Sequence, residues 1–146
     1  MDAYESWYGL DGIFLDESAS SEDQIPYYRA LSRHIRSAGK RLVVANPGVV
    51  PADGYFELAD TVVTFEGSYG AYAGALERMP AWVGRLPQGR TAHLVYGASR
   101  EQALEAVSRE SGAASVYVTS GSLPNPWGEL PSYLEETEEQ LLESCS

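Results

Sequence analysis

Cysteines, long apolar runs and basic residues are all scarce in this sequence, and each shortage excludes a class of protein. Cys145 is the single cysteine, so an internal disulfide is impossible. No apolar run approaches the ~18 residues that a membrane-spanning helix needs. The chain has 10 Lys and Arg and 21 Asp and Glu, which gives a formal net charge of -11. This balance argues against a nucleic-acid partner, because phosphate binding needs a basic surface.

Several catalytic and cofactor motifs are also missing. There is no Gly-x-Ser-x-Gly sequence and no phosphate-binding glycine loop. We therefore expect neither a nucleophilic triad nor a nucleotide, and no cofactor at all. Residues 1–7 have no basic segment followed by an apolar one, so no signal peptide is predicted within this chain.

The remaining composition is that of one globular domain. The chain has 146 residues, 44% of them hydrophobic, and 10 are Tyr, which is enough to build a buried core. The acidic residues are unevenly placed, because six Glu and no Lys or Arg follow Gly128. We interpret this segment as the solvated face of a terminal helix.

Short apolar runs alternate with helical patterns along the chain. Strands are predicted at 12–15, 42–45, 61–65, 92–96 and 115–118. Helices are predicted at 25–38 after a capping segment at 20–23, at 99–111 with Ser99 as cap, and at 130–143. A short helix is expected at 55–59, and 69–88 is expected to be a long loop with one or two helical turns. This order predicts an α/β fold whose parallel strands are buried on both faces.

Polar residues close each predicted strand. In parallel α/β folds the carboxyl ends of the strands share one face, where ligands bind. The sequence therefore predicts a site at this face, formed by Asp16 and Glu17, Asn46, Glu66, Tyr96 and Thr119.

Three of these residues are carboxylic acids. Hydrolysis of a glycosidic bond needs two carboxyl groups, which Asp16, Glu17 and Glu66 can supply. Neighbouring residues of a strand point to opposite faces, so we expect Asp16 or Glu17 to lie in the bend that follows. Two alternatives remain open: an acid after a strand can cap a helix, and clustered carboxylates can hold Mg²⁺.

Aromatic residues lie at or near the same strand ends. Flat rings with polar edges suit the faces of pyranose sugars. This group consists of Tyr69, Tyr72, Trp82, Tyr96, Tyr117 and Trp127. Packing in the core or in a loop is the alternative for Tyr117 and Trp82. His34 and His93 are both interpreted as structural.

Several segments of the chain carry a family resemblance. They are WYGLDGIFLDE at 7–17, PYY at 26–28, NPG at 46–48, DTVVTFE at 60–66, LVYG at 94–97, LPNPW at 123–127 and LPSY at 130–133. In this order they resemble the spherulation-specific family 4, or spherulin-4-like, proteins. The resemblance implies a (β/α)₈ barrel of TIM type and similarity to glycoside hydrolases that cleave α-1,4-linked galactosaminogalactan, an exopolysaccharide containing N-acetylgalactosamine.

The resemblance also implies roles for the site residues. Asp16 would be the nucleophile, Glu66 the general acid and base, and Glu17 a supporting carboxylate, with no metal. Asn46, Tyr96 and Trp127 would contact the sugar, and we add Tyr69 and Thr119 to this substrate-binding group. A secreted or cell-surface location follows from the same resemblance.

The matching pattern starts at the helix before the fourth barrel strand. A full barrel takes ~250 residues, so we expect residues 1–146 to form an incomplete barrel covering about strands 4 to 8. Such a sheet would have two open edges, through which copies could associate. A non-catalytic polysaccharide-binding or cell-surface module is the alternative function, followed by a divalent-metal α/β enzyme.

Overall fold

The structure is a computed structural model that describes residues 7–39, 42–108 and 111–144. The chain divides into two compact units, Met1–Thr64 (unit 1) and Phe65–Ser146 (unit 2). Each unit is described on its own. Cys145 and most of the segment tested for a signal peptide lie outside the described residues.

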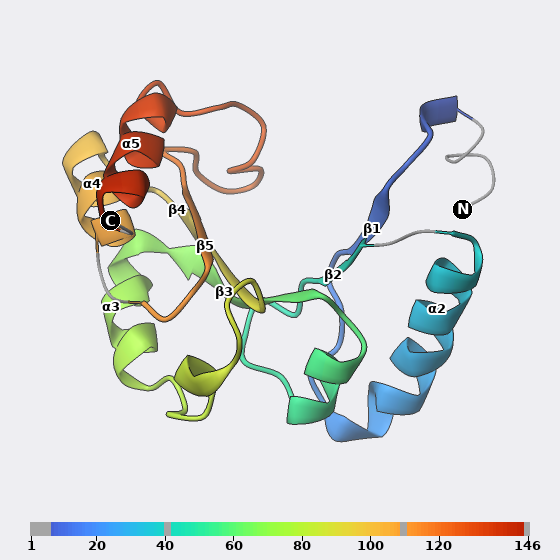
Figure 1. Cartoon of the computed structure of the whole chain (residues 1–146). Helices are drawn as coiled ribbons and strands as arrows, with labels where there is room; N and C mark the ends of the chain where they lie inside the picture. The colour runs from blue at the N-terminus through green and yellow to red at the C-terminus, as the bar shows by residue number, and fades with distance from the viewer. Residues whose placement is uncertain (1–6, 40–41, 109–110, 145–146) are drawn as a thin grey trace. The chain divides into compact units, whose positions relative to one another are not determined.

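Five strands form one sheet in the order β1-β2-β3-β4-β5 (Figure 1). Their bounds are Gly12–Leu15, Leu42–Ala45, Thr61–Ser68, Thr91–Tyr96 and Ser115–Val118. The pairs β1·β2, β2·β3 and β4·β5 are parallel, with Gly12 opposite Leu42 and Ala92 opposite Ser115. The predicted α/β fold with a five-stranded parallel sheet is confirmed.

The helices alternate with these strands, as βα units require. The α-helices are α2 (Ile25–Ser37), α3 (Tyr69–Glu77), α4 (Arg100–Ser108) and α5 (Leu134–Ser144). Short 3₁₀ helices are η1 (Glu22–Gln24), η2 (Asp53–Glu57) and η3 (Val83–Arg85). Among the described residues no helix is long and apolar enough to cross a membrane.

Unit 1 buries the apolar face of α2 against β2. Ile35 of α2 is fully buried, as is Val62 of β3, and Val43 of β2 is 1% exposed. The Ser32 hydroxyl donates to the Leu58 carbonyl oxygen at 2.6 Å, which satisfies a polar group inside this core. Truncating a buried Ile typically costs about 2–5 kcal/mol, so Ile35 is a main attachment of the helix to the sheet.

Unit 2 has the larger apolar core, built where α3, α4 and α5 lie beside β4 and β5 (Figure 1). Phe65, Tyr72 and Val95 pack there with small residues of α4. Helix α4 begins with a reciprocal cap: the Gln102 N–H donates to Ser99 Oγ at 3.3 Å, and the Ser99 N–H donates to Gln102 Oε1 at 2.9 Å. This confirms Ser99 as the cap.

Several predicted boundaries differ from the observed ones by one to four residues, and three differences change the interpretation. Strand β3 runs three residues beyond 65, so Glu66 lies inside the strand and does not close it. Helix α3 starts at Tyr69, where a loop was expected, because three Ala and one Leu outweigh two Gly in helix propensity. Helix α5 begins at Leu134 instead of residue 130, after a turn in which the Leu134 N–H donates to the Pro131 carbonyl oxygen at 3.2 Å.

Two further details of unit 1 correct the sequence analysis. The side chains at 20–23 make no capping bond to α2, which continues directly from η1 with Pro26 in its first turn. Burial on both faces is wrong for β1, since Phe14 is 51% exposed. As β1 ends the strand order, it has one neighbouring strand among those described.

Candidate functional site

In unit 1 the predicted site residues lie where β1 and β2 end. Asp16 and Glu17 are exposed and form the turn after β1, and Asn46 is buried directly after β2. The Asn46 Nδ2 donates to Asp16 Oδ1 at 2.9 Å, while Asn46 Oδ1 accepts the Gly48 N–H at 3.1 Å. Asn46 therefore positions the Asp16 carboxylate, and the Asn46 amide is itself fixed by the Gly48 N–H.

The backbone of the same turn is fastened by the sheet. The Asn46 N–H donates to the Leu15 carbonyl oxygen at 2.8 Å, and the Ser18 N–H donates to the Asn46 carbonyl oxygen at 2.9 Å. Between them Glu17 adopts a left-handed backbone with φ 48. A side chain in this conformation costs about 1–2 kcal/mol. Both acids, not one of them as predicted, thus lie in the bend.

Two tyrosines hold the segment after this turn. The Tyr28 hydroxyl accepts the Ala19 N–H at 2.9 Å, and the Tyr55 hydroxyl donates to the Ser21 carbonyl oxygen at 3.1 Å. Their rings are 5.5 Å apart. Sequence reasoning missed this role of Tyr28, because the bond joins residues that are nine positions apart and in different elements.

In unit 2 the predicted acid Glu66 lies against aromatic residues. The Trp127 indole Nε1–H donates to Glu66 Oε1 at 3.2 Å. The Trp127 ring centroid is 6.1 Å from that of Tyr96, which ends β4, and 6.1 Å from that of Tyr117 in β5. The structure thus brings together Glu66, Tyr96, Tyr117 and Trp127, which we call the aromatic cluster. All four are partly exposed.

The other predicted substrate contacts of unit 2 have structural partners. The Tyr69 hydroxyl donates to Glu105 Oε2 on α4 at 2.7 Å, and its ring packs against the core. Thr119 is 1% exposed, and its Oγ1 accepts the Gly121 N–H at 3.1 Å. The side-chain hydroxyls of Tyr69 and Thr119 therefore each make a hydrogen bond within unit 2.

Tyr72 and His93 are fully buried in the core of unit 2. The Tyr72 hydroxyl and His93 Nδ1 are 2.8 Å apart, and the rings meet edge to face. Burial lowers the pKa of His93 to about 4, so the imidazole is neutral inside the fold at pH 7. Tyr72 is therefore a core residue, contrary to its predicted place among sugar-binding aromatics.

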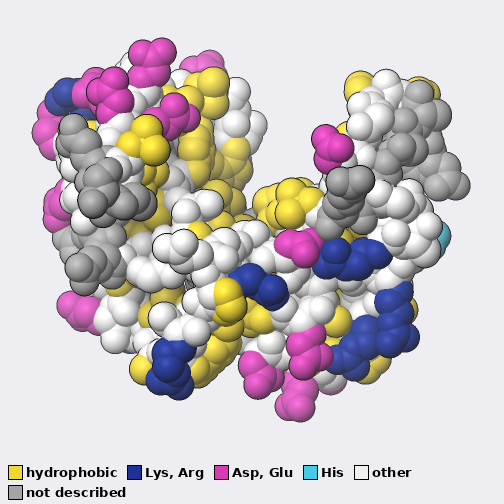
Figure 2. All heavy atoms as spheres, viewed as in Figure 1, with side chains coloured by type: hydrophobic (Ala, Val, Ile, Leu, Met, Phe, Trp, Pro, Cys, Tyr) yellow, Lys and Arg dark blue, Asp and Glu magenta, His cyan; other side chains and the backbone are white. Residues whose placement is uncertain are grey.

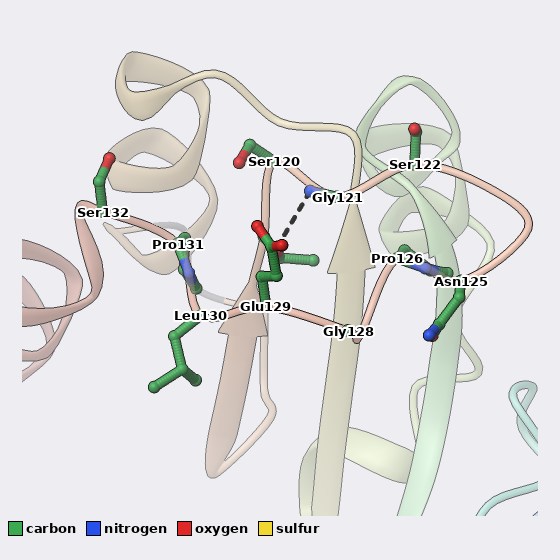
Figure 3. Close-up of a pocket in the computed structure, with 11 residues that line it drawn as sticks. Ser120, Gly121, Ser122, Asn125, Pro126, Gly128, Glu129, Leu130, Pro131 and Ser132 are labelled. Carbon is green, nitrogen blue, oxygen red and sulfur yellow. Dashed lines mark hydrogen bonds between the residues drawn. The ribbon is translucent and has the colours of Figure 1, made fainter.

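A pocket opens after β5, in the loop that leads to α5 (Figure 3). Its polar lining includes Thr119, Ser120, Ser122, Asn125, Glu129 and Ser132. The glutamates after Gly128 were interpreted together as one face of a terminal helix, but Glu129 lies before α5, which begins at Leu134. Sequence reasoning missed the pocket because residues 119–132 have no periodic pattern.

Among the described residues, no three His, Cys, Asp or Glu side chains are grouped as metal ligands. The sites of the two units thus offer carboxylates, amides, hydroxyls and aromatic rings. These groups suit a polyhydroxylated ligand, which needs both hydrogen bonds and stacking.

Comparison with known proteins agrees with this picture. The model of spherulation-specific family 4 matches residues 1–141. Spherulin-4 of Physarum polycephalum is 43% identical over 68 residues, which are 45% of this chain and 20% of that protein. The chain therefore matches about a fifth of the length of this curated relative.

A solved structure shares the fold. The crystal structure of Aspergillus clavatus Sph3 in complex with GalNAc superimposes with a TM-score of 0.72 at 18% identity, covering 95% of this chain and 61% of Sph3. At this identity the likeness establishes the architecture alone. The family model, which matches residues 1–141, gives the identification: this chain belongs to spherulation-specific family 4.

Proposed function

We propose that the chain is a glycoside hydrolase-like domain that acts on a polysaccharide containing N-acetylgalactosamine or galactosamine. The observation that carries this proposal is the aromatic cluster, in which Trp127 orients the Glu66 carboxylate and presents its ring beside Tyr96 and Tyr117. A carboxylic acid beside partly exposed aromatic rings can bind a pyranose face and act on its glycosidic bond. The complex of Sph3 with GalNAc, a protein of the same fold, supports this choice of sugar.

The proposed chemistry gives Asp16 and Glu66 the roles that the family resemblance implies. Glu66 donates a proton to the leaving glycosidic oxygen while Asp16 attacks the anomeric carbon and forms a glycosyl-enzyme bond. Glu66 then removes a proton from water, and the water oxygen displaces Asp16 from the sugar. Asn46 positions Asp16 through its 2.9 Å hydrogen bond, and Glu17 serves as a supporting carboxylate.

The finer features of the proposal follow from the family resemblance. The five strands would correspond to strands 4 to 8 of a (β/α)₈ barrel, and the activity would be that of an endo-α-1,4-N-acetylgalactosaminidase. A secreted or cell-surface location fits an exopolysaccharide substrate. Association of copies through the sheet ends at β1 and β5 is part of the same proposal.

The test measures the release of reducing ends from α-1,4-linked N-acetylgalactosamine polymer. We expect the unmutated chain to release them, and Glu66→Gln and Asp16→Asn to lose about 10²–10⁴-fold in rate. Both variants preserve the local geometry, because Gln can still accept the Trp127 N–H and Asn can still accept from Asn46. Asp53→Asn and Glu138→Gln, which change exposed acids elsewhere, are the controls and retain full rate. Equal rates in all five chains would refute the assignment of these carboxylates.

A non-catalytic polysaccharide-binding module is the second candidate. It is favoured by one observation, that the aromatic cluster and the pocket after β5 both lie within unit 2 and need no carboxylate from unit 1. Binding of the polymer without any release of reducing ends, unaffected by Asp16→Asn, would establish this function instead.

A further inference from the structure

The loop after β5 folds back on itself before it reaches the aromatic cluster. It starts at Thr119 and returns at Pro126, directly before Trp127. Figure 3 shows Gly121 and Pro126 on the two arms of this loop. At Gly121 a Cβ would collide with the Pro126 carbonyl oxygen and would lie 2.7 Å from the Pro126 carbonyl carbon. The two arms therefore approach this closely only because residue 121 is glycine.

The first arm of the loop is bonded to the end of β4. The Gly97 N–H donates to the Gly121 carbonyl oxygen at 2.9 Å, and the Gly121 N–H donates to Thr119 Oγ1 at 3.1 Å. Thr119 itself is 1% exposed. Gly97 directly follows Tyr96, whose ring centroid lies 6.1 Å from that of Trp127. The first arm is thus fixed beside one of the rings that Trp127 contacts.

The second arm carries Trp127 to Glu66. Pro126 is buried where it meets Gly121. The next residue, Trp127, donates its indole Nε1–H to Glu66 Oε1 at 3.2 Å. Because Pro126 and Trp127 are adjacent in the chain, a displacement of Pro126 would move the indole that bonds the carboxylate.

The loop is closed without charged side chains of its own. Residues 119–128 contain no Asp, Glu, Lys or Arg, whereas acidic side chains gather over α4 and α5 of the same unit (Figure 2). The closing contacts are instead the backbone fit between Gly121 and Pro126 and the hydrogen bond to Thr119.

We infer that Gly121 is a positioning residue, which closes this loop and thereby holds the Trp127 indole against Glu66. The inference rests on the proposed function, because it gives Gly121 a part in placing the proposed general acid and base. A Cβ at residue 121 requires Pro126 to move, and this movement breaks or lengthens the 3.2 Å bond from the indole. Gly121 acts through Trp127 and takes no part in the chemistry itself.

The test observes the Trp127 contact through the nuclear magnetic resonance signals of the indole N–H groups. The chain has 3 Trp, so the ¹⁵N-labelled full chain gives three such signals, each assigned by replacing one Trp with Phe. In the otherwise unmutated chain Glu66→Gln should shift the Trp127 signal, because the acceptor changes from a carboxylate to a neutral amide. The Trp7 signal, from unit 1, is the internal reference and should not move.

Gly121→Ala should shift the Trp127 signal and abolish its response to Glu66→Gln. It should also lower the release of reducing ends by about 10²-fold, the usual effect of displacing a group of the site by about 1 Å. Gly84→Ala is the matched control, since Gly84 is exposed in η3 and a Cβ there meets nothing within 4 Å. It should change neither the signal nor the rate. The inference is overturned if Gly121→Ala keeps the full response, if it loses the response but keeps the rate of an active chain, or if Gly84→Ala acts in the same way.

A second pair of variants decides the question if thermal unfolding shows that Gly121→Ala does not fold. Thr119→Val removes the hydroxyl that accepts the Gly121 N–H, whereas Thr119→Ser keeps it. We expect Thr119→Val to reduce the response of the Trp127 signal and to lower the rate about 10-fold, and Thr119→Ser to stay within twofold of the unmutated chain. The signal is recorded without sugar, so a direct contact of Thr119 with a ligand does not affect it. Equal behaviour of the two variants overturns the inference.

This inference and the proposed function can fail separately, because the signal does not depend on hydrolysis. If no chain releases reducing ends but Gly121→Ala abolishes the Trp127 response, the hydrolase proposal fails and the role of Gly121 in holding Trp127 stands. If the unmutated chain cleaves the polymer and Gly121→Ala keeps both its rate and its response, the proposed function stands and the inference fails.

Discussion

The two units hold their candidate carboxylates by different means. In unit 1 Asp16 is bonded to a buried amide, Asn46, and the turn between them is tied to the parallel strands β1 and β2. In unit 2 Glu66 is bonded to the indole of Trp127, which comes from the long loop after β5. The first arrangement is polar and depends on strand register, and the second is aromatic and depends on how a loop closes.

The difference lies in what surrounds each acid. Asp16 accepts a hydrogen bond from the side-chain amide of Asn46, beside a turn that backbone bonds tie to β2. Glu66 accepts one from the indole of Trp127, whose ring lies beside Tyr96 and Tyr117. Strand register positions the first carboxylate, and the long loop after β5 positions the second.

The largest expected effect is a loss of stability at low pH, caused by the buried His93 of unit 2. His93 is neutral in unit 2 with its pKa lowered to about 4, against 6.5 for an ordinary histidine. Because only the unfolded chain takes up this proton between those values, stability is fully present above pH 6.5 and falls as the pH drops toward 4. Between pH 7.5 and pH 5 the loss from this residue is about 2 kcal/mol. Urea unfolding at the two pH values measures it.

His93→Gln should remove this part of the pH dependence while keeping a hydrogen-bond partner for Tyr72. His34→Gln is the control, since His34 is exposed on α2 in unit 1. An unchanged pH dependence in His93→Gln would show that the imidazole is not kept neutral by its burial.

The next effect is on stability, through the hydrogen bond between Asn46 and Asp16 in unit 1. In Asn46→Asp the donor to Asp16 becomes a second carboxylate, so we expect a loss of about 2 kcal/mol in unfolding free energy. The exchange variant Asp16→Asn/Asn46→Asp restores one donor and one acceptor at the same 2.9 Å contact. It should recover most of the stability but not the hydrolytic activity. If the exchange is as unstable as Asn46→Asp alone, the contact contributes little to the fold.

The sequence predicted features that depend on local pattern. Three strands were predicted with their observed bounds, since short β-branched runs are flanked by turn residues, and α4 was predicted from its Ser99 cap. The pairing of Glu66 with Trp127 was not predicted as a contact, because it joins residues 61 positions apart through a loop without periodicity. The pocket around Glu129 was missed for the same reason.

A smaller effect tests the aromatic cluster of unit 2. Trp127→Phe keeps a ring beside Tyr96 but removes the N–H that binds Glu66, so we expect a loss of about 1 kcal/mol in stability. Trp7→Phe, a change of an exposed indole in unit 1, should alter stability by less than ~0.5 kcal/mol. Equal effects on chemical unfolding would mean that the indole N–H contributes nothing measurable to the fold.

The smallest effect is a gain in stability, expected at Glu17 in the turn after β1. Glu17 has a left-handed backbone with φ 48, which glycine adopts without strain. Glu17→Gly should therefore raise the unfolding free energy by up to about 1 kcal/mol, after allowing for the greater freedom of glycine in the unfolded chain. The matched control, Glu22→Gly in η1, should lower it. If Glu17 supports catalysis, its replacement by glycine must raise stability and lower the rate of hydrolysis together, as expected where strain is kept for function. A variant that gains stability and keeps its full rate would leave the strained conformation without a catalytic reason.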